Sequence, residues 1–222
     1  MIETINNLDP IVIVKNEQIR HSTAAKRNMT KIRNKYRDED IKIIAKHFPE
    51  IKSVLCVGCR DDSEVRHFIK NGVGCIGIDV SNETKYIKRI DAHKLNEHFN
   101  HFDLIYSSHS LEHMYNPNKV LSNIRNLKPI GVYIVLPLQK KPLTLKHPSK
   151  FEIMKIENQG DSIEDIIAKK KDIFENPKDH QNVWGDFNSL KPFTILDWIF
   201  RDGINPREKE VAFLLKLKWL EI

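Results

Sequence analysis

Cysteine is scarce in this chain of 222 residues. The three cysteines are Cys56, Cys59 and Cys75. An odd number of cysteines at apolar positions indicates reduced thiols and therefore an intracellular protein. Cys56 and Cys59 form a C-x-x-C pair, but no second ligand pair follows at the spacing that a zinc site needs. We therefore expect no metal site.

Long apolar runs are also missing. The longest run covers residues 132–138 and is interrupted by Pro137, whereas a membrane-spanning helix needs about 20 apolar residues. The N-terminus carries acidic residues early and has no apolar stretch typical of a signal peptide. These absences predict a soluble, cytoplasmic protein without a membrane partner.

Glycine is rare, with eight residues, and three glycine-based motifs are absent. The chain has no G-x-G-x-x-G fingerprint for a dinucleotide, no Walker loop and no G-x-S-x-G elbow. Tyr115 and Lys119 match the Y-x-x-x-K pair of short-chain dehydrogenases, but Pro117 between them would break the helix that this pair needs. An NAD-dependent oxidoreductase, a serine hydrolase and an NTPase are therefore not expected.

The remaining composition is that of a globular protein: 40% of the residues are hydrophobic and 30% are charged, with a net charge of +6. This length suffices for one domain with a full core. Short apolar runs predict strands at 51–57, 74–79, 86–91, 102–107, 131–136 and 211–217. Helical patterns separate the first five, and this alternation is typical of a doubly wound α/β sheet.

Capping signals place the helices between these strands. Asp38–Asp40 are expected to cap one helix, and Asp61 or Asp62 to begin the next, which Asn71-Gly72 would end. Asn116-Pro117 is expected to open a third helix. The apolar sides predicted for these helices are Ile41, Ile43, Ile44 and Phe48 in the first, Val65, Phe68 and Ile69 in the second, and Val120, Leu121, Ile124 and Leu127 in the third.

We divide the single expected domain, residues 1–222, into four parts. Residues 1–37 form an N-terminal arm and a basic helix, 38–137 the core that binds a cofactor, 138–188 a lid-like insertion with a helix near 163–174, and 189–222 a closing helix (189–202) and strand. The run Ile11–Val14 is either an edge strand or part of a disordered arm. The basic stretch 26–37 is either a solvated helix face or a contact for an anionic substrate.

Three positions at strand ends indicate an adenosine ligand. Gly58 ends the first core strand before a helix, where a ligand can approach the backbone and the free N–H groups of the helix. Asp79 ends the second strand 21 positions later, where a carboxylate can bind the ribose hydroxyls. Asp91 ends the third strand.

Five segments carry a family resemblance: VLCVGCRDDSEV, GCIGIDVS, RIDAHKL, HFDLIYSSHSLEHM and LKPIGVYIVLPL. Together they resemble class I S-adenosylmethionine (SAM)-dependent methyltransferases, most of all the small type 11 group. The resemblance implies a Rossmann-like, doubly wound, seven-stranded and mostly parallel sheet with an antiparallel last strand, and SAM as cofactor. It implies that the cofactor-binding residues are Gly58, Cys59, Arg60, Asp79, Val80, Asp91, Ala92, His93, Ser107, Ser108 and His109.

By this resemblance, Gly58 and Cys59 approach the methionine part of SAM, and Asp79 holds the ribose. Asp91 with Ala92 recognises the adenine, and residues 107–109 form the floor beneath the methionyl group. The chain departs from the family at Cys56, where an acid is usual, and at Arg60 and Asp62, where glycines are usual. Arg60 would either pair with the SAM carboxylate or crowd the site. A non-catalytic binding subunit with the SAM fold is therefore an alternative.

The candidate bases for an oxygen acceptor are His113, His109 and His180, because imidazole titrates near neutral pH. An architectural role for the Leu-Glu-His turn is the alternative for His113. The lid is rich in Lys and His, which suits a small polar acceptor, and we expect O-methylation of a sugar or glycan hydroxyl. The basic charge leaves an RNA-directed methyltransferase as a second alternative. Nothing in the sequence indicates an oligomeric state.

Overall fold

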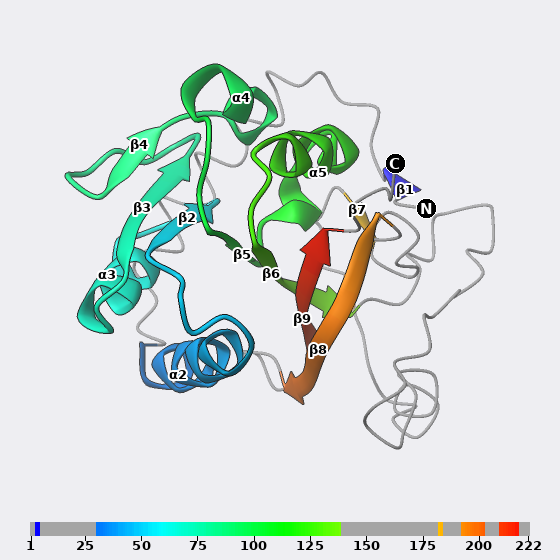
Figure 1. The fold of residues 1–222 in the computed structure, drawn as a ribbon. Coiled ribbons are helices and arrows are strands. Elements are labelled where there is room, and N and C mark those ends of the chain that lie inside the picture. Colours follow the sequence, from blue (N-terminus) through cyan, green and yellow to red (C-terminus); the bar gives the residue numbers. More distant parts are fainter. Residues whose placement is uncertain (1–2, 5–29, 139–181, 184–191, 203–208, 218–222) are drawn as a thin grey trace, which may run out of the picture.

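The computed structural model of the chain describes residues 3–4, 30–138, 182–183, 192–202 and 209–217 (Figure 1). Several sequence predictions lie wholly or largely outside these ranges: the N-terminal arm with the run at 11–14, and the lid-like insertion 138–188 with its helix near 163–174 and His180.

A seven-stranded sheet forms the centre of the molecule, with the strand order β4-β3-β2-β5-β6-β9-β8. The five strands predicted between residues 51 and 137 are all present and mutually parallel. The final strand, β9, runs antiparallel to both neighbours, as the family resemblance implies. The strands are β2 (Ser53–Val57), β3 (Gly74–Asp79), β4 (Ile87–Arg89), β5 (Leu104–Ser108), β6 (Gly131–Leu138), β8 (Phe193–Asp202) and β9 (Lys209–Leu217).

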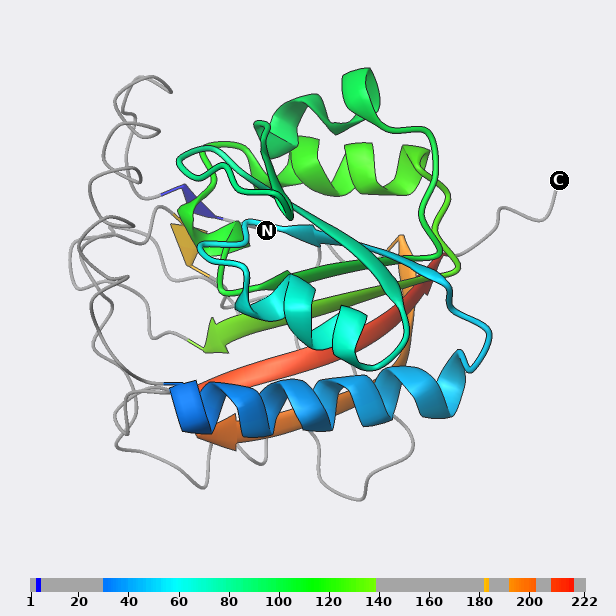
Figure 2. The ribbon, with the colours of Figure 1, turned by 90° about the vertical axis from the view of Figure 1, so that its left-hand side faces the viewer.

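Helices cover both faces of this sheet. Figure 2 shows α2 (Thr30–His47) and α3 (Ser63–Lys70) on one face, and α4 (Leu95–His98) and α5 (Pro117–Asn126) on the other. Two apolar clusters result, one between each helical layer and the sheet. Two 3-10 turns, η1 (Ala92–Lys94) and η2 (Leu111–His113), follow β4 and β5. A separate antiparallel pair joins β1 (Glu3–Thr4) to β7 (Asn182–Val183).

The start of α2 corrects one expectation. Asp38–Asp40 do not cap this helix, because it begins at Thr30 and these acids lie in its interior. Asp40 is buried and accepts hydrogen bonds from the hydroxyls of Tyr106 and Tyr133, 2.8 and 2.7 Å away. The Asp40 carboxylate therefore contacts residues far away in the chain. An acidic residue next to an apolar stripe does not mark the start of a helix in this case. Helix α2 ends at His47, two residues before Pro49.

Helix α3 begins after Asp62 and is followed by Asn71 and Gly72, as predicted. Val65 and Phe68 are buried, but Ile69 is 41% exposed, so its predicted inward position is wrong. Successive helical residues differ by about 100° in direction. Ile69 therefore lies about 100° from Phe68 and about 40° from Val65, at the edge of the buried stripe, where its side chain remains partly in solvent.

Helix α5 follows its sequence signals closely. The side chain of Asn116 accepts a hydrogen bond from the Lys119 N–H at 3.0 Å, and Pro117 occupies the first turn, where no N–H is needed. The four predicted inward positions of this segment are buried.

The segment expected as a closing helix at 189–202 is instead the ten-residue strand β8 over Phe193–Asp202. A β-bulge at Leu196 shifts the register between Ile195 and Asp197. Because the bulge inserts one residue, Phe193, Ile195, Trp198 and Phe200 all pack on one apolar cluster despite the break in alternation. Apolar positions three residues apart therefore imitated a helical pattern.

Candidate functional site

The carboxyl ends of β2, β3 and β5 lie side by side, because β2 is hydrogen-bonded to both of the others. Gly58 follows β2, Asp79 ends β3, and Ser108 ends β5. The sheet therefore brings together three of the predicted positions at one edge. Ligands of open α/β sheets bind in the crevice outside such strand ends.

Gly58 is required by the geometry of this edge. Its φ of +78° lies in the left-handed region, and an added Cβ would stand 2.4 Å from the Cβ of Ser110. Ser110 Oγ in turn lies 3.0 Å from the Val57 carbonyl, to which it donates, and 2.7 Å from Ser107 Oγ. The turn after β5 is thus packed directly on the turn after β2, and Ser110 was not among the predicted site residues.

The side chain of Cys59 points away from the strand ends into the core. Its thiol is fully buried and donates to the Cys56 carbonyl at 3.2 Å. Burial raises the pKa of Cys59 to about 12, so the thiol stays neutral. Only the backbone of Cys59 can face a ligand here. Within the described ranges, no group of three or more His, Cys, Asp or Glu side chains is arranged to hold a metal ion.

Arg60 and Asp62, the departures from the glycine-rich loop, fasten this loop to the segment after β3. The Asn82 amide donates to the Arg60 carbonyl at 3.1 Å, and the Thr84 hydroxyl donates to Asp62 at 2.5 Å. Asp62 also stands at the N-cap position of α3. The Asp62 carboxylate therefore has a structural partner, whereas the bond at position 60 uses the backbone carbonyl, which any residue would supply. The positive φ of Gly58 is retained beside both residues.

Asp79 has a fixed orientation at the end of β3. It is 3% exposed, and one carboxylate oxygen accepts from both the N–H and the hydroxyl of Ser81, at 2.7 and 2.5 Å. The next residue, Val80, accepts from Arg89 Nε at 3.3 Å through its carbonyl. These contacts place a carboxylate beside the Gly58 turn, where a ribose would be held in this type of sheet.

Asp91 is organised by two aromatic rings after β4. His93 contacts Asp91 Oδ1 through its N–H at 2.9 Å and its Nδ1 at 2.5 Å, while the Tyr115 hydroxyl donates to Oδ2 at 3.3 Å. Burial alone would raise the pKa of Asp91, but these hydrogen bonds lower it, so the group stays ionised. The rings of His93 and Tyr115 stack with centroids 3.6 Å apart. Ala92 is buried beside them.

The tautomer of His93 follows from its second nitrogen. Nε2 accepts a hydrogen bond from the Asn116 N–H at 3.2 Å, so Nδ1 carries the proton that is shared with Asp91. Tyr115 was considered in the sequence only as part of an excluded dehydrogenase pair. Its contact with Asp91 depends on two loops that meet at the sheet edge, and no local pattern indicates it.

His109 occupies an unusual position directly after β5. Its φ is +50°, and its N–H donates to the Val135 carbonyl at 3.1 Å. Its Nε2 lies 2.6 Å from Glu210 and its Nδ1 lies 3.5 Å from Glu112. Burial opposes the charged form, but these two carboxylates raise the pKa of His109 to about 10. The ring is therefore an imidazolium at neutral pH and has no lone pair with which to accept a proton.

His113 lies in η2 and is 7% exposed. Its Nε2 lies 3.7 Å from Glu112, and its N–H donates to the Ser110 carbonyl at 3.0 Å. The backbone contact accords with the architectural reading of the Leu-Glu-His turn. The third candidate base, His180, lies outside the described residues.

A chain of ion pairs extends from His109 across the sheet edge. Glu210 binds both His109 and Arg201 Nε, and Arg201 reaches Asp40 with 2.7 Å between its Nη1 and the carboxylate. Sequence reasoning missed Glu210 and Arg201 and assigned Asp40 to a cap. His109 and Glu210 are 101 residues apart in the sequence, and Asp40 and Arg201 are 161 apart. No short-range spacing in the sequence therefore reveals these contacts.

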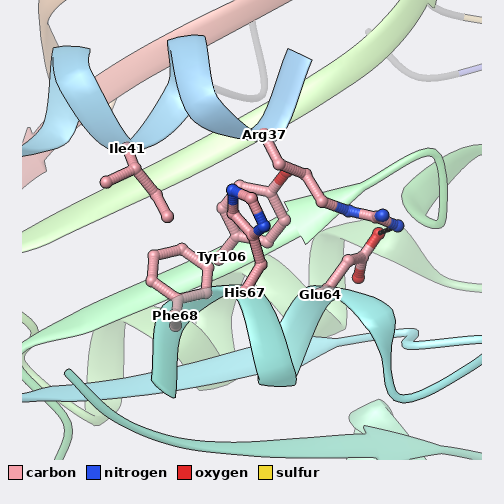
Figure 3. Close-up of a pocket in the computed structure, with 6 residues that line it drawn as sticks. All are labelled: Arg37, Ile41, Glu64, His67, Phe68 and Tyr106. Carbon is pink, nitrogen blue, oxygen red and sulfur yellow. Dashed lines mark ion pairs between the residues drawn. The ribbon is translucent and has the colours of Figure 1, made fainter. Parts of the chain in front are cut away.

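A crevice between α2 and α3 lies apart from these strand ends (Figure 3). It leaves no room for a water molecule, and Arg37 from α2 pairs across it with Glu64 from α3 at 3.7 Å. Figure 3 shows Ile41 and Phe68 facing one another across the same gap. This crevice is helix packing, and the candidate site remains at the carboxyl edge of the sheet.

Comparisons with known proteins bear on this edge. A family described as methyltransferase domain matches residues 26–182. The fold resembles a 1,6-didemethyltoxoflavin-N1-methyltransferase from Burkholderia thailandensis, crystallised with S-adenosylhomocysteine (SAH), at 10% identity and a TM-score of 0.67; the match covers 98% of this chain and 95% of that one. No curated protein is significantly similar in sequence to this chain.

Two further structures share the fold. The N-methyltransferase NodS from Bradyrhizobium japonicum, in complex with SAH, is 11% identical with a TM-score of 0.54, and the match covers 95% of this chain and 100% of that one. The [4+2]-cyclase SpnF is 12% identical with a TM-score of 0.56, and the match covers 93% of each chain. Since the cyclase has the same architecture, these likenesses show the fold and not the reaction.

No helix in the described ranges is long and apolar enough to cross a bilayer. The family match covers well over half of the chain and includes every described strand end of the site. The Gly58 turn, the Asp79 carboxylate and Asp91 fit the methionine, ribose and adenine parts of SAM in kind and in order along the sheet edge. The chain therefore belongs to the methyltransferase domain family and is a class I SAM-dependent methyltransferase.

Proposed function

We propose that this methyltransferase modifies a small polar acceptor, with a hydroxyl group of a sugar or similar compound as the first candidate. The observation that carries the proposal is the charged ring of His109 directly after β5. Its side chain is 29% exposed, and the buried carboxylates of Glu112 and Glu210 hold the ring as an imidazolium. A charged, hydrogen-bonding ring suits a polar acceptor better than a flat apolar one.

The cofactor contacts belong to the same proposal. Gly58 and the backbone of Cys59 would lie along the methionine part, with Arg60 near its carboxylate. Asp79 and Val80 would border the ribose, Asp91 with Ala92 and His93 the adenine, and residues 107–109 the floor. SAM supplies a methyl group on a sulfonium, which needs an aligned acceptor more than chemical activation by the protein.

The lid assignment of 138–188 has one structural support. The strand β7, at Asn182–Val183, lies beside η2, so the chain returns to the strand-end side of the sheet after the insertion. A segment that ends there is well placed to border an acceptor.

A hydroxyl acceptor needs a base, and His109 is unsuited to that role while it is an imidazolium between two carboxylates. His113 and His180 are the remaining candidates. His113→Gln should lower turnover at saturating SAM without changing SAH affinity, since Gln keeps the bulk of the ring but cannot take a proton at neutral pH. Full turnover in this variant would remove His113 from the mechanism.

An amine nitrogen is the second candidate acceptor, favoured by the charge state of His109. A neutral amine attacks a methyl sulfonium with its own lone pair, so no base is needed before transfer. The toxoflavin-pathway protein and NodS are both described as N-methyltransferases.

An RNA acceptor gains less support from the described part of the basic stretch. Arg37 is buried against Glu64, and Lys35 lies 3.8 Å from Glu39 on the same helix. A non-catalytic subunit also gains little, because the Gly58 turn keeps its positive φ beside Arg60 and Asp62.

The test is transfer of a labelled methyl group from SAM to three acceptor panels: neutral sugars, amino sugars with other small amines, and RNA. We expect label in a sugar panel, with O- or N-linkage decided by mass spectrometry of the product. Label in amines alone would replace the hydroxyl proposal with the amine one. Label in RNA alone, or in none of the panels despite SAH binding, would overturn the proposal.

A further inference from the structure

Four buried or half-buried charged residues form a continuous chain of ion pairs from the site to the first helix. His109 binds Glu210 at 2.6 Å, Glu210 binds Arg201 Nε, and Arg201 Nη1 binds Asp40 at 2.7 Å. We call this the His109–Asp40 chain. It joins the end of β5 to β9, then to β8, then to α2, and α2 is the helix that covers this face of the sheet (Figure 2).

Two members of the chain, Asp40 and Arg201, make further contacts. Asp40 also accepts from the hydroxyls of Tyr106 and Tyr133, and the Arg201 guanidinium lies 4.4 Å from the ring centroid of Tyr36. The side chains of Asp40, Glu210 and Arg201 are 1%, 2% and 8% exposed. Buried ion pairs are retained only where geometry and extra hydrogen bonds compensate for lost hydration. This chain meets that condition at every step.

The chain ends on a strained residue. His109 holds a φ of +50°, which a non-glycine residue adopts only when its surroundings enforce it. The enforcing contacts are the backbone bond to Val135 and the ring contacts to Glu210 and Glu112. The adjacent residue, Ser110, is the one packed on Gly58. Because His109 and Ser110 are adjacent, the contacts that hold His109 also restrict where Ser110 meets the Gly58 turn.

We propose that Glu210 and Arg201 are positioning residues for the cofactor. They clamp His109 so that the turn 107–110 stays against Gly58, and through Asp40 they fasten this turn to α2. The inference concerns cofactor binding alone and does not depend on which acceptor is methylated.

A purely structural ion pair would stabilise the fold without tuning the site, so the test needs a readout specific to His109. The charged and titratable groups that face its ring are Glu112 from η2 and Glu210 from β9; behind Glu210 stand Arg201 from β8 and Tyr36, Glu39 and Asp40 from α2. Removing the charge of Glu210 should make the imidazolium easier to deprotonate.

The first experiment compares the full chain with its Glu210→Gln variant. Nuclear magnetic resonance of the His109 ring follows its titration, and calorimetry with SAH measures affinity at each pH. In the wild type we expect SAH affinity to fall as His109 loses its proton near pH 10. In Glu210→Gln the proton concentration at the midpoint of the His109 titration should rise at least tenfold, which moves the midpoint toward neutral pH. SAH should then bind about tenfold more weakly at pH 8.

The matched control is Glu39→Gln. Glu39 is a half-buried carboxylate 3.9 Å from the same Arg201, but it does not contact His109. This variant removes the same charge near the same guanidinium, so it should leave the His109 titration and the SAH affinity unchanged.

His109→Asn tests the chain from its other end and keeps Glu210 paired with Arg201. Asparagine tolerates positive φ, so the fold should survive while the link to Glu210 is lost. SAH affinity should fall, and its dependence on pH near 10 should disappear. The double variant with Glu210→Gln should bind no more weakly than the weaker single one, since linked residues give non-additive effects.

Unchanged SAH affinity in Glu210→Gln, with or without a shifted His109 titration, would overturn the positioning role. Fully additive losses in the double variant would overturn the link between the two residues. If Glu210→Gln fails to fold, the pH dependence of His109→Asn against the wild type decides, because a persistent fall in affinity near pH 10 would contradict the proposal.

Discussion

At the residue scale, two glycines with the same backbone conformation allow the cost of backbone strain to be distinguished from the cost of steric crowding. Gly58 and Gly72 have φ values of +78° and +81°, but only Gly58 faces a neighbour, whereas an added Cβ at Gly72 meets nothing within 4 Å. Gly72→Ala should therefore cost about 1–2 kcal/mol of unfolding free energy, the penalty for a left-handed L-residue.

Gly58→Ala should cost more, because crowding against Ser110 adds about 1–3 kcal/mol to the same strain. SAH affinity should also fall in this variant and stay unchanged in Gly72→Ala. Urea unfolding and calorimetric titration measure both quantities. Equal stability losses at the two positions would mean that Ser110 yields freely and that the contact does not order the turn.

The ribose assignment of Asp79 can be tested against a second aspartate. Asp79→Ala should weaken SAM binding by about 1.5–3 kcal/mol, the usual value of hydrogen bonds to a charged group. Asp38→Ala is the control, since Asp38 lies in α2, is largely exposed and pairs with His67 of α3. Calorimetry on both variants gives the result; an unchanged dissociation constant in Asp79→Ala would refute the assignment.

The pH dependence of stability has a defined sign at His109. Its pKa is raised in the folded protein to about 10, above the value of about 6.5 in an unfolded chain. Its stabilising contribution is therefore complete below about pH 6.5, declines above it, and is lost by about pH 10. The stability difference between the wild type and His109→Asn should shrink over this window in urea titrations at successive pH values, and a difference that grows with pH would contradict the ion pair.

At the scale of elements, helix α3 provides a matched pair of adjacent positions. Phe68 is buried against the sheet, whereas Ile69 is 41% exposed. Phe68→Ala should destabilise the protein by about 3–5 kcal/mol, and Ile69→Ala should change stability by less than about 1 kcal/mol. Thermal or chemical unfolding distinguishes them, and a large loss at Ile69 would mean that this helix turns a different face to the core.

The elements also show where sequence patterns carried enough information. Helix α5 was predictable because Asn116 and Pro117 act within one turn of the chain. Strand β8 was not, because its bulge at Leu196 broke the alternation that identifies a strand. Its partner β9 was predicted from the apolar run at 211–215 and the Leu217 that follows. Sequence patterns predict an element correctly when contacts within a few residues form it. Strand β8 instead depends on its pairing with the later strand β9.

At the scale of the whole molecule, cofactor binding should stabilise the folded chain by mass action. SAH at one hundred times its dissociation constant should add about 2.7 kcal/mol, or roughly 5–10 °C in melting temperature for a chain of this size. Scanning fluorimetry with SAH, and with adenosine as a weaker ligand, measures this shift. No shift with SAH at millimolar concentration would contradict an intact cofactor site.

The strands of the parallel core, their alternation with helices, and the Gly58, Asp79 and Asp91 positions near the strand ends could all be read from the chain. These features follow from apolar periodicity and turn residues, which act over a few residues. Three other features became visible only in the folded chain: β8 is a strand, Asp40 is a buried ion partner, and His109 is held as an imidazolium. Each of these depends on contacts between residues far apart in the chain, where burial and neighbouring charge, and not residue type, set the chemistry.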